Sequence, residues 1–364
     1  MSNAPETQPA NSPLPFTFGG FTVPAGCRRI FITAQLEPSN GDPRIQPTGF
    51  PDIGPVMYPD PSGQNGLICL IESEASMANR LEEVCFSNKY EGALKAEIRG
   101  LPYLRAEAGK EKTFKTSSTL DGHRFASDFL AKGKANFGDG EKTLADHIRT
   151  TLGMSDNGKT MPIARIPEVF QLVMELDPLS LVHGFQISNE QVSFVGLRLA
   201  RALTASVIGL NCERIAVPGI KFNVGQVESD SGQAIFQKQR ITAREIEARF
   251  SIDVGLLASL RLDTPTNGNP GPRQNARFQL LLAIALWKVA TFLELLRVEL
   301  SLRTECKLRL RGNPRVTTEG GQTSASIDFP YSTIAQASLV GADDGLIPKA
   351  QLPANRHPLV LSFA

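Results

Sequence analysis

The stretch Leu67–Cys85, LICLIESEASMANRLEEVC, changes within a few residues from a strand pattern to a helix pattern. Its first five residues are all apolar, and they predict a buried strand over Leu67–Ile71. The apolar residues between Met77 and Cys85 then recur at helical spacing, with Ser73 or Ser76 available as the N-cap. The chain is therefore expected to contain a strand that runs directly into an amphipathic helix.

The segments on either side of this stretch differ in regularity. Arg28–Leu36, RRIFITAQL, is rich in β-branched and aromatic residues and predicts a first strand. Glu37–Ser62 is so rich in proline and glycine that it predicts a long loop without regular structure, which is functional or disordered. Gly92–Phe137 alternates poorly and is basic, and it predicts an irregular excursion with one short helix near Arg124–Ala131.

The clearest helix pattern is Arg277–Leu300, which is apolar on all sides and is therefore expected in the middle of the fold. Glu305–Arg311, ECKLRLR, alternates strictly and predicts a strand with one cationic face. Thr242 and Glu245 form a capping-box pattern that predicts a helix over Ala243–Phe250. Weaker patterns predict helices at Leu144–Leu152 and Pro167–Leu176, strands at Gly184–Leu197 and Ala200–Leu210, and a projecting hairpin over Phe222–Arg240 with its turn at Asp230–Gly232.

The net charge of the chain is close to zero, with 38 lysines and arginines against 37 aspartates and glutamates. This balance excludes a uniformly basic nucleic-acid-binding protein but not a basic groove on a neutral molecule. The charge is unevenly distributed, because Glu37–Glu97 holds ten acidic and four basic residues whereas Arg303–Arg315 holds five basic residues and one acidic residue. Such segments either are solvated faces or allow copies of the chain to associate head to tail through unlike surfaces.

Cysteine usage, the N-terminus and hydropathy indicate the compartment. The five cysteines are widely spread and form no CxxC pair, which favours a reducing compartment over a disulfide scaffold. The N-terminus is polar and proline-rich, so residues 1–25 are expected to form a disordered arm rather than a secretory signal. Phe278–Leu296, the most apolar stretch, carries Lys288 and Glu294 and falls short of a membrane span. We therefore expect a cytoplasmic protein without a membrane role.

The sequence contains no catalytic motif in the structural context that the motif requires. The four histidines lie far apart without HExxH or HxH spacing, so no metal site is predicted. The phosphate-binding pattern GxxxxGK[ST] occurs once, at Gly153–Thr160 (GMSDNGKT), but it follows the helix expected at Leu144–Leu152 and not the strand that precedes a P-loop. The pattern GxGxxG and the nucleophile pattern GxSxG do not occur. Paired carboxylates such as Glu72 and Glu74 are expected to be solvated or to cap helices. By elimination, the sequence predicts a binding or structural subunit that has no cofactor and is not an enzyme.

One group of polar residues lies where a helix begins directly after a strand. Ser76, Asn79 and Arg80 occupy the first turns of that helix, where free backbone N–H groups and the helix dipole favour a phosphate. The alternative is that Ser76 caps the helix, Asn79 is exposed and Arg80 pairs with Glu83.

Two other places combine a glycine with a cation or a histidine. His123 and Arg124 follow Asp121-Gly122, so the turn either presents both side chains to a backbone or is an ordinary turn. Lys221 follows Pro218-Gly219, which suits a rigid loop that offers an ammonium group to phosphate, although a solvated lysine is the simpler alternative. His183 lies between a helix and a strand and is expected to be a structural residue.

Six blocks of the sequence resemble, in the same order, the repeated backbone subunit of the subtype I-U CRISPR surveillance (Cascade) complex, a subtype also called I-G. The blocks are Gln46–Gly54 (QPTGFPDIG), Leu70–Glu82 (LIESEASMANRLE), His123–Ser127 (HRFAS), Asp177–Phe185 (DPLSLVHGF), Arg198–Leu203 (RLARAL) and Pro218–Lys221 (PGIK). The resemblance covers residues 28–262, and the first two blocks are the specific ones. Beyond residue 262 it rests only on helix and strand pattern.

The resemblance implies an α+β fold, because this family belongs to the RAMP superfamily, whose palm is RRM-like, or ferredoxin-like. Such a palm is a β-α-β-β-α-β sheet with helices on one face. Residues 26–364 are then expected to form one elaborated domain. Its insertions are a finger-like region over residues 92–160 and a thumb hairpin over residues 222–240 that folds over the guide RNA.

The resemblance also implies binding without turnover. Several copies would stack along one CRISPR RNA as a helical filament, bind the other subunits of the complex, and present the spacer to a target DNA strand. Phe50 and Met77 would stack on bases or wedge between them. The residues implied in RNA binding are Arg44, Gln46, Ser76, Asn79, Arg80, His123, Arg124, Lys221 and Arg240.

Two alternatives remain open from the sequence. The first is a metal-dependent endoribonuclease of the same superfamily, in which Asp42 or His123 would take part in the chemistry. The second is an unrelated globular enzyme. RNA that copurifies with a ladder of oligomers would favour the binding subunit, whereas magnesium-dependent shortening of RNA would favour the nuclease.

Overall fold

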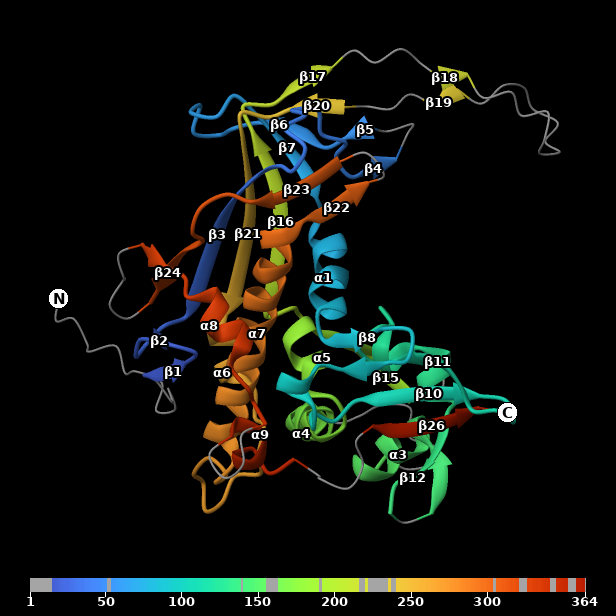
Figure 1. The fold of residues 1–364 in the computed structure, drawn as a ribbon. Helices are drawn as coiled ribbons and strands as arrows, with labels where there is room; N and C mark the ends of the chain where they lie inside the picture. Colours follow the sequence, from blue (N-terminus) through green and yellow to red (C-terminus); the bar gives the residue numbers. More distant parts are fainter. Residues whose placement is uncertain are drawn as a thin grey trace.

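A nine-stranded antiparallel sheet forms the main sheet of the molecule (Figure 1). The computed structural model describes residues 15–363, except for 51–53, 139, 155–162, 190–191, 216–219, 222–234, 237–239, 304–305, 321–325, 341–344 and 353–357. The strand order is β22-β23-β3-β21-β16-β7-β6. One edge of β3 pairs with β23 near its end and with β24 near its beginning, and β24 also pairs with β25. These strands are β3 (Arg29–Pro38), β6 (Met57–Pro59), β7 (Leu67–Glu72), β16 (Leu203–Leu210), β21 (Glu245–Asp253), β22 (Leu300–Arg303), β23 (Cys306–Leu310), β24 (Arg315–Glu319) and β25 (Ile327–Asp328).

Two helices connect the central strands across one face of this sheet. Helix α1 (Glu74–Glu83) lies between β3 and β16 in the chain, and α7 (Gln274–Val298) lies between β21 and β23. The strands β3 and β16 both run antiparallel to β21, and β21 and β23 both run antiparallel to β3, so each helix lies between two strands of the same direction. The side chains of β3 alternate accordingly, with Ile30 and Ile32 fully buried on the helix side and Phe31 exposed on the opposite side.

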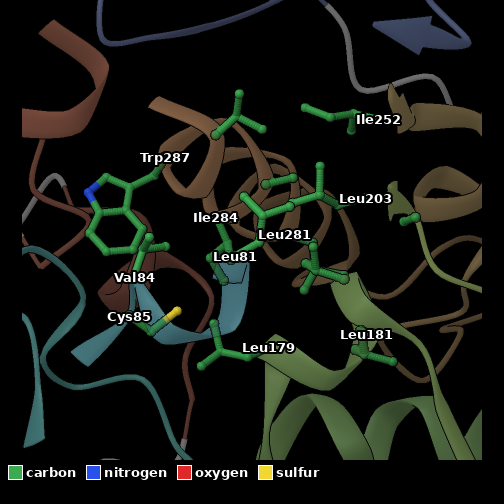
Figure 2. Close-up of a cluster of buried hydrophobic side chains, with 14 of the residues drawn as sticks. Leu81, Val84, Cys85, Leu179, Leu181, Leu203, Ile252, Leu281, Ile284 and Trp287 are labelled. Carbon is green, nitrogen blue, oxygen red and sulfur yellow. The ribbon is translucent and has the colours of Figure 1, made fainter. Parts of the chain in front are cut away.

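Helix α7 confirms the helix expected over Arg277–Leu300 and lies in the middle of the core. Figure 2 shows Leu281, Ile284 and Trp287 of α7 gathered with residues of α1, the sheet and α5 (Pro178–His183). The helix is long and apolar enough to cross a membrane, yet 83% of its most apolar window is buried inside the protein. Packing against both the sheet and other helices explains its apolar residues on every side.

A second sheet of five strands lies beside the helices, in the order β11-β10-β26-β12-β13. Four of its strands come from one region: β10 (Leu104–Ala108), β11 (Thr113–Ser117), β12 (Lys134–Asn136) and β13 (Glu141–Thr143). The fifth, β26 (Leu359–Phe363), comes from the end of the chain and pairs parallel with β10 and antiparallel with β12. The expectation that Gly92–Phe137 is irregular is therefore wrong, because its strands are stabilised by a partner about 250 residues away.

The remaining elements surround these two sheets. The helices are α2 (Asp128–Ala131), α3 (Leu144–Thr151), α4 (Ile166–Leu176), α6 (Val254–Ser259), α8 (Tyr331–Gln336) and α9 (Leu346–Lys349), with 3-10 turns η1 (Ala96–Ile98), η2 (Arg124–Ala126) and η3 (Ile163–Arg165). Short antiparallel pairs are β1 (Phe16–Phe18) with β2 (Phe21–Val23), β4 (Gly49–Phe50) with β5 (Gly54–Pro55), β8 (Phe86–Asn88) with β9 (Ala93–Leu94), β14 (Phe185–Asn189) with β15 (Val192–Leu199), β17 (Glu213–Ile215) with β20 (Arg240–Thr242), and β18 (Ile220–Lys221) with β19 (Ile235–Phe236).

Three further expectations need correction. The helix expected over Ala243–Phe250 is the strand β21, whose alternate residues Ile246, Ala248, Phe250 and Ile252 are buried. The proline-rich loop contains β6, which lies at the edge of the main sheet, where a strand tolerates proline. The segment Gly184–Leu197 is a hairpin of β14 and β15 rather than one strand.

The disordered arm expected over residues 1–25 does not extend to residue 25. Residues 16–23 form the hairpin of β1 and β2, and Phe16, Phe18, Phe21 and Val23 are buried. The ring of Phe21 packs edge-on against Phe329, with centroids 5.8 Å apart. Burial of four large apolar side chains outweighs the cost of ordering this short segment.

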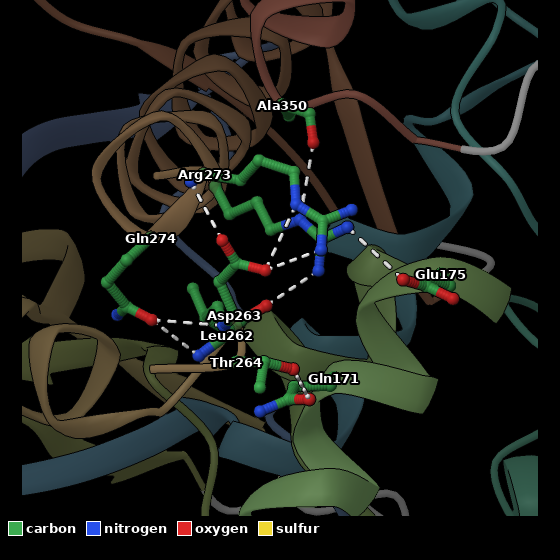
Figure 3. A network of polar contacts seen from close by, with 9 residues as sticks. Gln171, Glu175, Leu262, Asp263, Thr264, Arg273, Gln274 and Ala350 are labelled. Atoms are coloured by element: carbon green, nitrogen blue, oxygen red, sulfur yellow. Dashed lines mark hydrogen bonds and ion pairs between the residues drawn. The ribbon is translucent and has the colours of Figure 1, made fainter. Parts of the chain in front are cut away.

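A polar network holds the start of α7 (Figure 3). Asp263 is buried and accepts hydrogen bonds from the backbone N–H of Arg273 at 2.8 Å and from its guanidinium at 2.6 and 3.0 Å. The side chain of Gln274 accepts from the backbone N–H of Leu262 at 2.7 Å, and Arg277 donates to the Leu262 carbonyl at 2.6 Å. The loop before α7 is therefore fixed by side chains of the helix itself.

Asp263→Asn is expected to lower the free energy of unfolding by about 2–3 kcal/mol, since it weakens charge-assisted hydrogen bonds in a buried place. Burial raises the pKa of Asp263, but the hydrogen bonds from Arg273 outweigh it and hold the pKa below its usual value. This stabilisation is present above the ordinary carboxyl pKa and is lost as the pH falls through the lowered one. Urea unfolding measures it, with the exposed Asp128→Asn as the control. Equal losses in both variants would contradict the assigned role.

Candidate nucleic-acid interface

Three of the implied RNA-binding residues meet at one end of the main sheet, although the chain separates them widely. The loop after β3 is joined to β20 by an antiparallel bridge between Ile45 and Ile241, with N–H···O distances of 2.8 and 2.9 Å. Both isoleucines are fully buried, which anchors the loop. Arg44 and Gln46 flank Ile45 in the chain, and Arg240 precedes Ile241. The bridge therefore brings these three polar residues to one place.

An acidic residue lies within this group. The carboxylate of Asp42 accepts from the Arg44 side chain at 2.6, 2.9 and 3.0 Å and from the Arg44 backbone N–H at 3.0 Å. These hydrogen bonds, together with the positive charge of Arg240, lower the pKa of Asp42 to about 2. Asp42 is therefore ionised at neutral pH and holds the Arg44 guanidinium in a fixed position.

The thiol of Cys306 lies beside the same group. Burial raises its pKa, while a hydrogen bond with the backbone of Gln46 and the charge of Arg240 act in the opposite direction. Cys306 is the first residue of β23, so this strand contacts the loop after β3 at Gln46. All five cysteines are buried and free of disulfides.

A hairpin extends from this end of the sheet (Figure 1). It begins with β17 and returns through β20, and the β18–β19 pair continues the antiparallel ladder farther out. The hairpin is therefore longer than the expected range Phe222–Arg240, and most of that range, including the expected turn at Asp230–Gly232, lies outside the described residues. Lys221 is in β18, but its side chain is also outside them.

The helix α1 confirms the expected strand-to-helix junction, with Ser73 as the N-cap. The Ser73 hydroxyl accepts from the Ser76 backbone N–H at 3.3 Å, so Ser76 is not the cap. Asn79 is exposed, and Ser76 is half-buried. One of the backbone N–H groups at the start of α1, that of Ser76, is therefore already bonded to the Ser73 side chain and is not free to bind a phosphate.

The alternative prediction that Arg80 pairs with Glu83 is wrong. Its guanidinium donates to the carboxylate of Glu72 at 2.8 Å and to the carbonyl of Ser301 at 3.2 Å. Glu83 instead pairs with Lys89. Arg80 is therefore fixed between β7 and β22, with 24% of its side chain exposed.

His123 precedes η2 as its N-cap and Arg124 is the first residue of η2, on a different part of the molecule from the Arg44 group. His123 is exposed, and its backbone N–H donates to Asp121 at 2.9 Å. Arg124 is buried and pairs with the buried carboxylate of Glu82 in α1. Its backbone φ of +45° lies in the left-handed region, which few residues other than glycine adopt. The turn therefore directs Arg124 into the core and not toward a nucleic-acid backbone.

Arg124 is part of a buried charged cluster that sequence reasoning missed. It also contains Glu82, Asp177, His183 and Lys288, and all five residues are buried. The Nδ1 of His183 lies 3.6 Å from the carboxylate of Glu82. Asp177 is the N-cap of α5, and its carboxylate accepts hydrogen bonds from the Ser180 hydroxyl at 2.6 Å and from the Leu179 backbone N–H at 3.0 Å. Burial, followed by the charges of Lys288 and Arg124, lowers the pKa of His183 well below its usual value. Lys288, a charged residue within an otherwise apolar helix pattern, was the feature of the sequence that could have indicated a buried charged cluster.

His183 is structural, as expected, but it is not satisfied by hydrogen bonds within the described residues. Neither ring nitrogen has a hydrogen-bond partner there. Met77, which the resemblance suggested for base stacking, is fully buried in the core. Phe50 lies in β4, and its side chain is outside the described part of the chain.

The described residues also hold no group of three or more His, Cys, Asp or Glu side chains that is suited to a metal ion. Asp42 and His123, the two residues named for the nuclease alternative, lie on separate elements and have different partners.

Residues 30–214 match the model of a family described as CRISPR-associated protein GSU0053. The chain belongs to this family. The expected resemblance to a CRISPR-associated family is thereby confirmed. The match in this GSU0053-family protein includes Arg44, Gln46, Ser76–Arg80 and the η2 turn, and it ends within β17.

One solved chain with a similar structure is described as "CRISPR RNA-guided surveillance complex, pre-nicking". The two chains share 12% sequence identity over 89% of this chain and 86% of that chain, with a TM-score of 0.33. No curated protein matches the sequence significantly. The assignment of the family therefore rests on the match over residues 30–214.

Proposed function

We propose that this GSU0053-family protein is a non-catalytic, CRISPR RNA-binding backbone subunit of a type I surveillance complex. Copies of the chain polymerise along the guide RNA in the cytoplasm, contact the other subunits, and present the spacer to the target DNA strand. Specificity comes from base pairing by the guide, while the protein contacts phosphate and sugar. The proposal includes no enzymatic step and no cofactor.

The connections of the central strands support an RRM-like palm. If β6 and β7, which lie between β3 and α1 in the chain, and β22, which lies between α7 and β23, are set aside, the main sheet and its two helices follow the order β3, α1, β16, β21, α7, β23. The sheet order of these four strands is β23-β3-β21-β16. This is a β-α-β-β-α-β order with both helices on one face. The strands β6 and β7 extend the sheet beyond this unit, and the second sheet and the hairpin are additions to it.

The observation that carries the proposal is the group of Arg44, Gln46 and Arg240 at the base of the projecting hairpin. Two guanidinium groups beside a hairpin suit a single-stranded backbone, because they neutralise successive phosphates without reading bases. Lys221 in the same hairpin and the exposed Asn79 in the middle of α1 remain predicted contacts. Arg124 is instead expected to act in folding, since its guanidinium is buried against Glu82.

The double variant Arg44→Gln/Arg240→Gln is expected to weaken binding of single-stranded RNA about tenfold. Each full phosphate contact contributes about 0.7 to the log-log dependence of affinity on salt, so the slope is expected to fall by up to about 1.4. Fluorescence anisotropy of a labelled RNA oligonucleotide over a range of salt concentrations measures both quantities.

The matched control is Arg29→Gln/Arg315→Gln. Both arginines pair with carboxylates at 49% and 50% side-chain exposure, and they lie on β3 and β24, away from the hairpin. This control removes the same charge and is expected to leave the slope nearly unchanged. Equal effects of the two double variants would contradict a specific site at Arg44 and Arg240, and no RNA binding by the unmodified chain would contradict the proposed function.

A further inference from the structure

Three arginines implied in RNA binding are each paired with a carboxylate of the same chain. Arg124 pairs with Glu82, Arg80 with Glu72, and Arg44 with Asp42. In each of these pairs the positive charge of the arginine is balanced by the negative charge of a carboxylate. An RNA phosphate that reaches one of these arginines must compete with the carboxylate already bound to it.

The three pairs differ in how far water reaches them. The side chains of Arg124 and Glu82 are 7% and 6% exposed, and those of Arg80 and Glu72 are 24% and 6% exposed. Separation of such a pair would leave a buried carboxylate without its partner, which is costly. Arg44 and Asp42 are 55% and 29% exposed, so water can solvate both groups when they separate.

The contact between Asp42 and Arg44 has the geometry of a phosphate complex. Nε of Arg44 reaches both carboxylate oxygens, at 2.9 and 3.0 Å, and Nη2 reaches one of them at 2.6 Å. Guanidinium groups bind carboxylate and phosphate oxygens through the same fork of N–H donors. The Asp42 backbone N–H is itself held by Asn40 at 3.0 Å, which keeps the carboxylate close to Arg44.

We propose that Asp42 is an internal competitor for phosphate that occupies Arg44 in the free chain and is displaced when single-stranded RNA binds. This inference rests on the proposed function. Displacement exchanges one ion pair for another, so a single phosphate gains little from Arg44. A strand that also reaches Arg240 and the hairpin gains several contacts at once. Asp42 thereby favours an RNA strand over isolated phosphates and disfavours loose electrostatic binding.

The deciding variant is Asp42→Asn, which keeps the size of the side chain and removes its charge. We expect it to bind a fluorescein-labelled single-stranded RNA about three- to tenfold more tightly than the unmodified chain. The salt slope is expected to steepen by up to about 0.7, because Arg44 then contributes a full phosphate contact. If Asp42 served to position Arg44 for RNA, the same variant would bind more weakly, and that result would overturn the inference.

Asp328→Asn is the matched control, because Asp328 also pairs with an exposed arginine, Arg315, and also has a lowered pKa. It changes the total charge equally but lies on β25, and we expect less than a twofold change in RNA affinity. A second control is Asp42→Asn in the Arg44→Gln background, where the gain is expected to disappear, since the two effects act through one contact.

The outcomes separate this inference from the proposed function. If the unmodified chain does not bind RNA, the proposed function fails. If it binds RNA, and Asp42→Asn behaves like Asp328→Asn or keeps its gain without Arg44, the competitor role of Asp42 is wrong while the proposed function stands.

Discussion

Replacement of Arg124 by methionine is expected to lower the free energy of unfolding by about 3–5 kcal/mol. The variant keeps most of the buried volume but leaves the carboxylate of Glu82 inside the core without its ion-pair partner. Burial already raises the pKa of Glu82, and the charge of Arg124 acts against that rise. Urea unfolding followed by circular dichroism measures the loss, with the exposed Arg261→Met as the control.

The double variant Glu82→Gln/Arg124→Met tests the same pair from the other side. Removal of both charges is expected to recover a substantial part of the lost stability, because no unpaired charge then remains buried. If Arg124→Met is as stable as the Arg261→Met control and instead loses RNA affinity, the structural role assigned to Arg124 is wrong and its implied role in RNA binding is favoured.

A mildly acidic solution is expected to destabilise the protein through His183. Its folded pKa is lowered, so below about pH 6.5 the unfolded chain binds a proton that the folded chain resists. Stability from this group is therefore full above pH 6.5 and falls by about 1.4 kcal/mol per pH unit until the folded pKa is reached.

The groups around His183 determine how this prediction is tested. It faces Glu82 from α1, Arg124 from η2, Lys288 from α7 and the charge of Arg201 before β16. Burial also raises the pKa values of Glu82 and Asp177, which then take up protons in the folded state and act in the opposite direction. The difference between the unmodified chain and His183→Leu isolates the histidine.

His183→Leu is therefore expected to have a flatter stability profile between pH 7 and 5 than the unmodified chain. The exposed His123→Leu is the control and is expected to follow the unmodified profile. Thermal unfolding at several pH values supplies the comparison. Parallel profiles for the unmodified chain and His183→Leu would show that His183 is protonated in the folded protein.

Local patterns located several central elements from the sequence. The strand expected at Arg28–Leu36 is β3 at Arg29–Pro38, and the helix expected over Arg277–Leu300 is α7 at Gln274–Val298. The alternation of Glu305–Arg311 also holds in β23, where Lys307 and Arg309 are exposed and pair with Glu299 and Glu37. The strands β3 and β23 bury alternate residues, and the helix α7 is buried on nearly all sides, so the burial of each element is visible in its own residues.

Elements that depend on a distant partner were missed. The segment Ala243–Phe250 contains a capping-box pattern, but β21 forms because β3 and β16 pair along both of its edges. Likewise β10 lies between β11 and β26, and β26 belongs to the end of the chain. Cross-strand pairing, rather than local propensity, stabilises such strands, and a single sequence does not display its pairings.

The candidate site shows the same division. Arg44, Arg80 and Arg124 are alike in the sequence as cations within or beside the matching blocks. The family resemblance, the first strand, the long buried helix and the near-zero net charge followed from the sequence by itself. Tertiary structure alone decided that Arg124 is buried, that Arg80 is held between β7 and β22, and that the Ile45–Ile241 bridge brings Arg44 near Arg240. The reason is physical: the availability of a charge depends on water and on the nearest carboxylate, and long-range packing decides both.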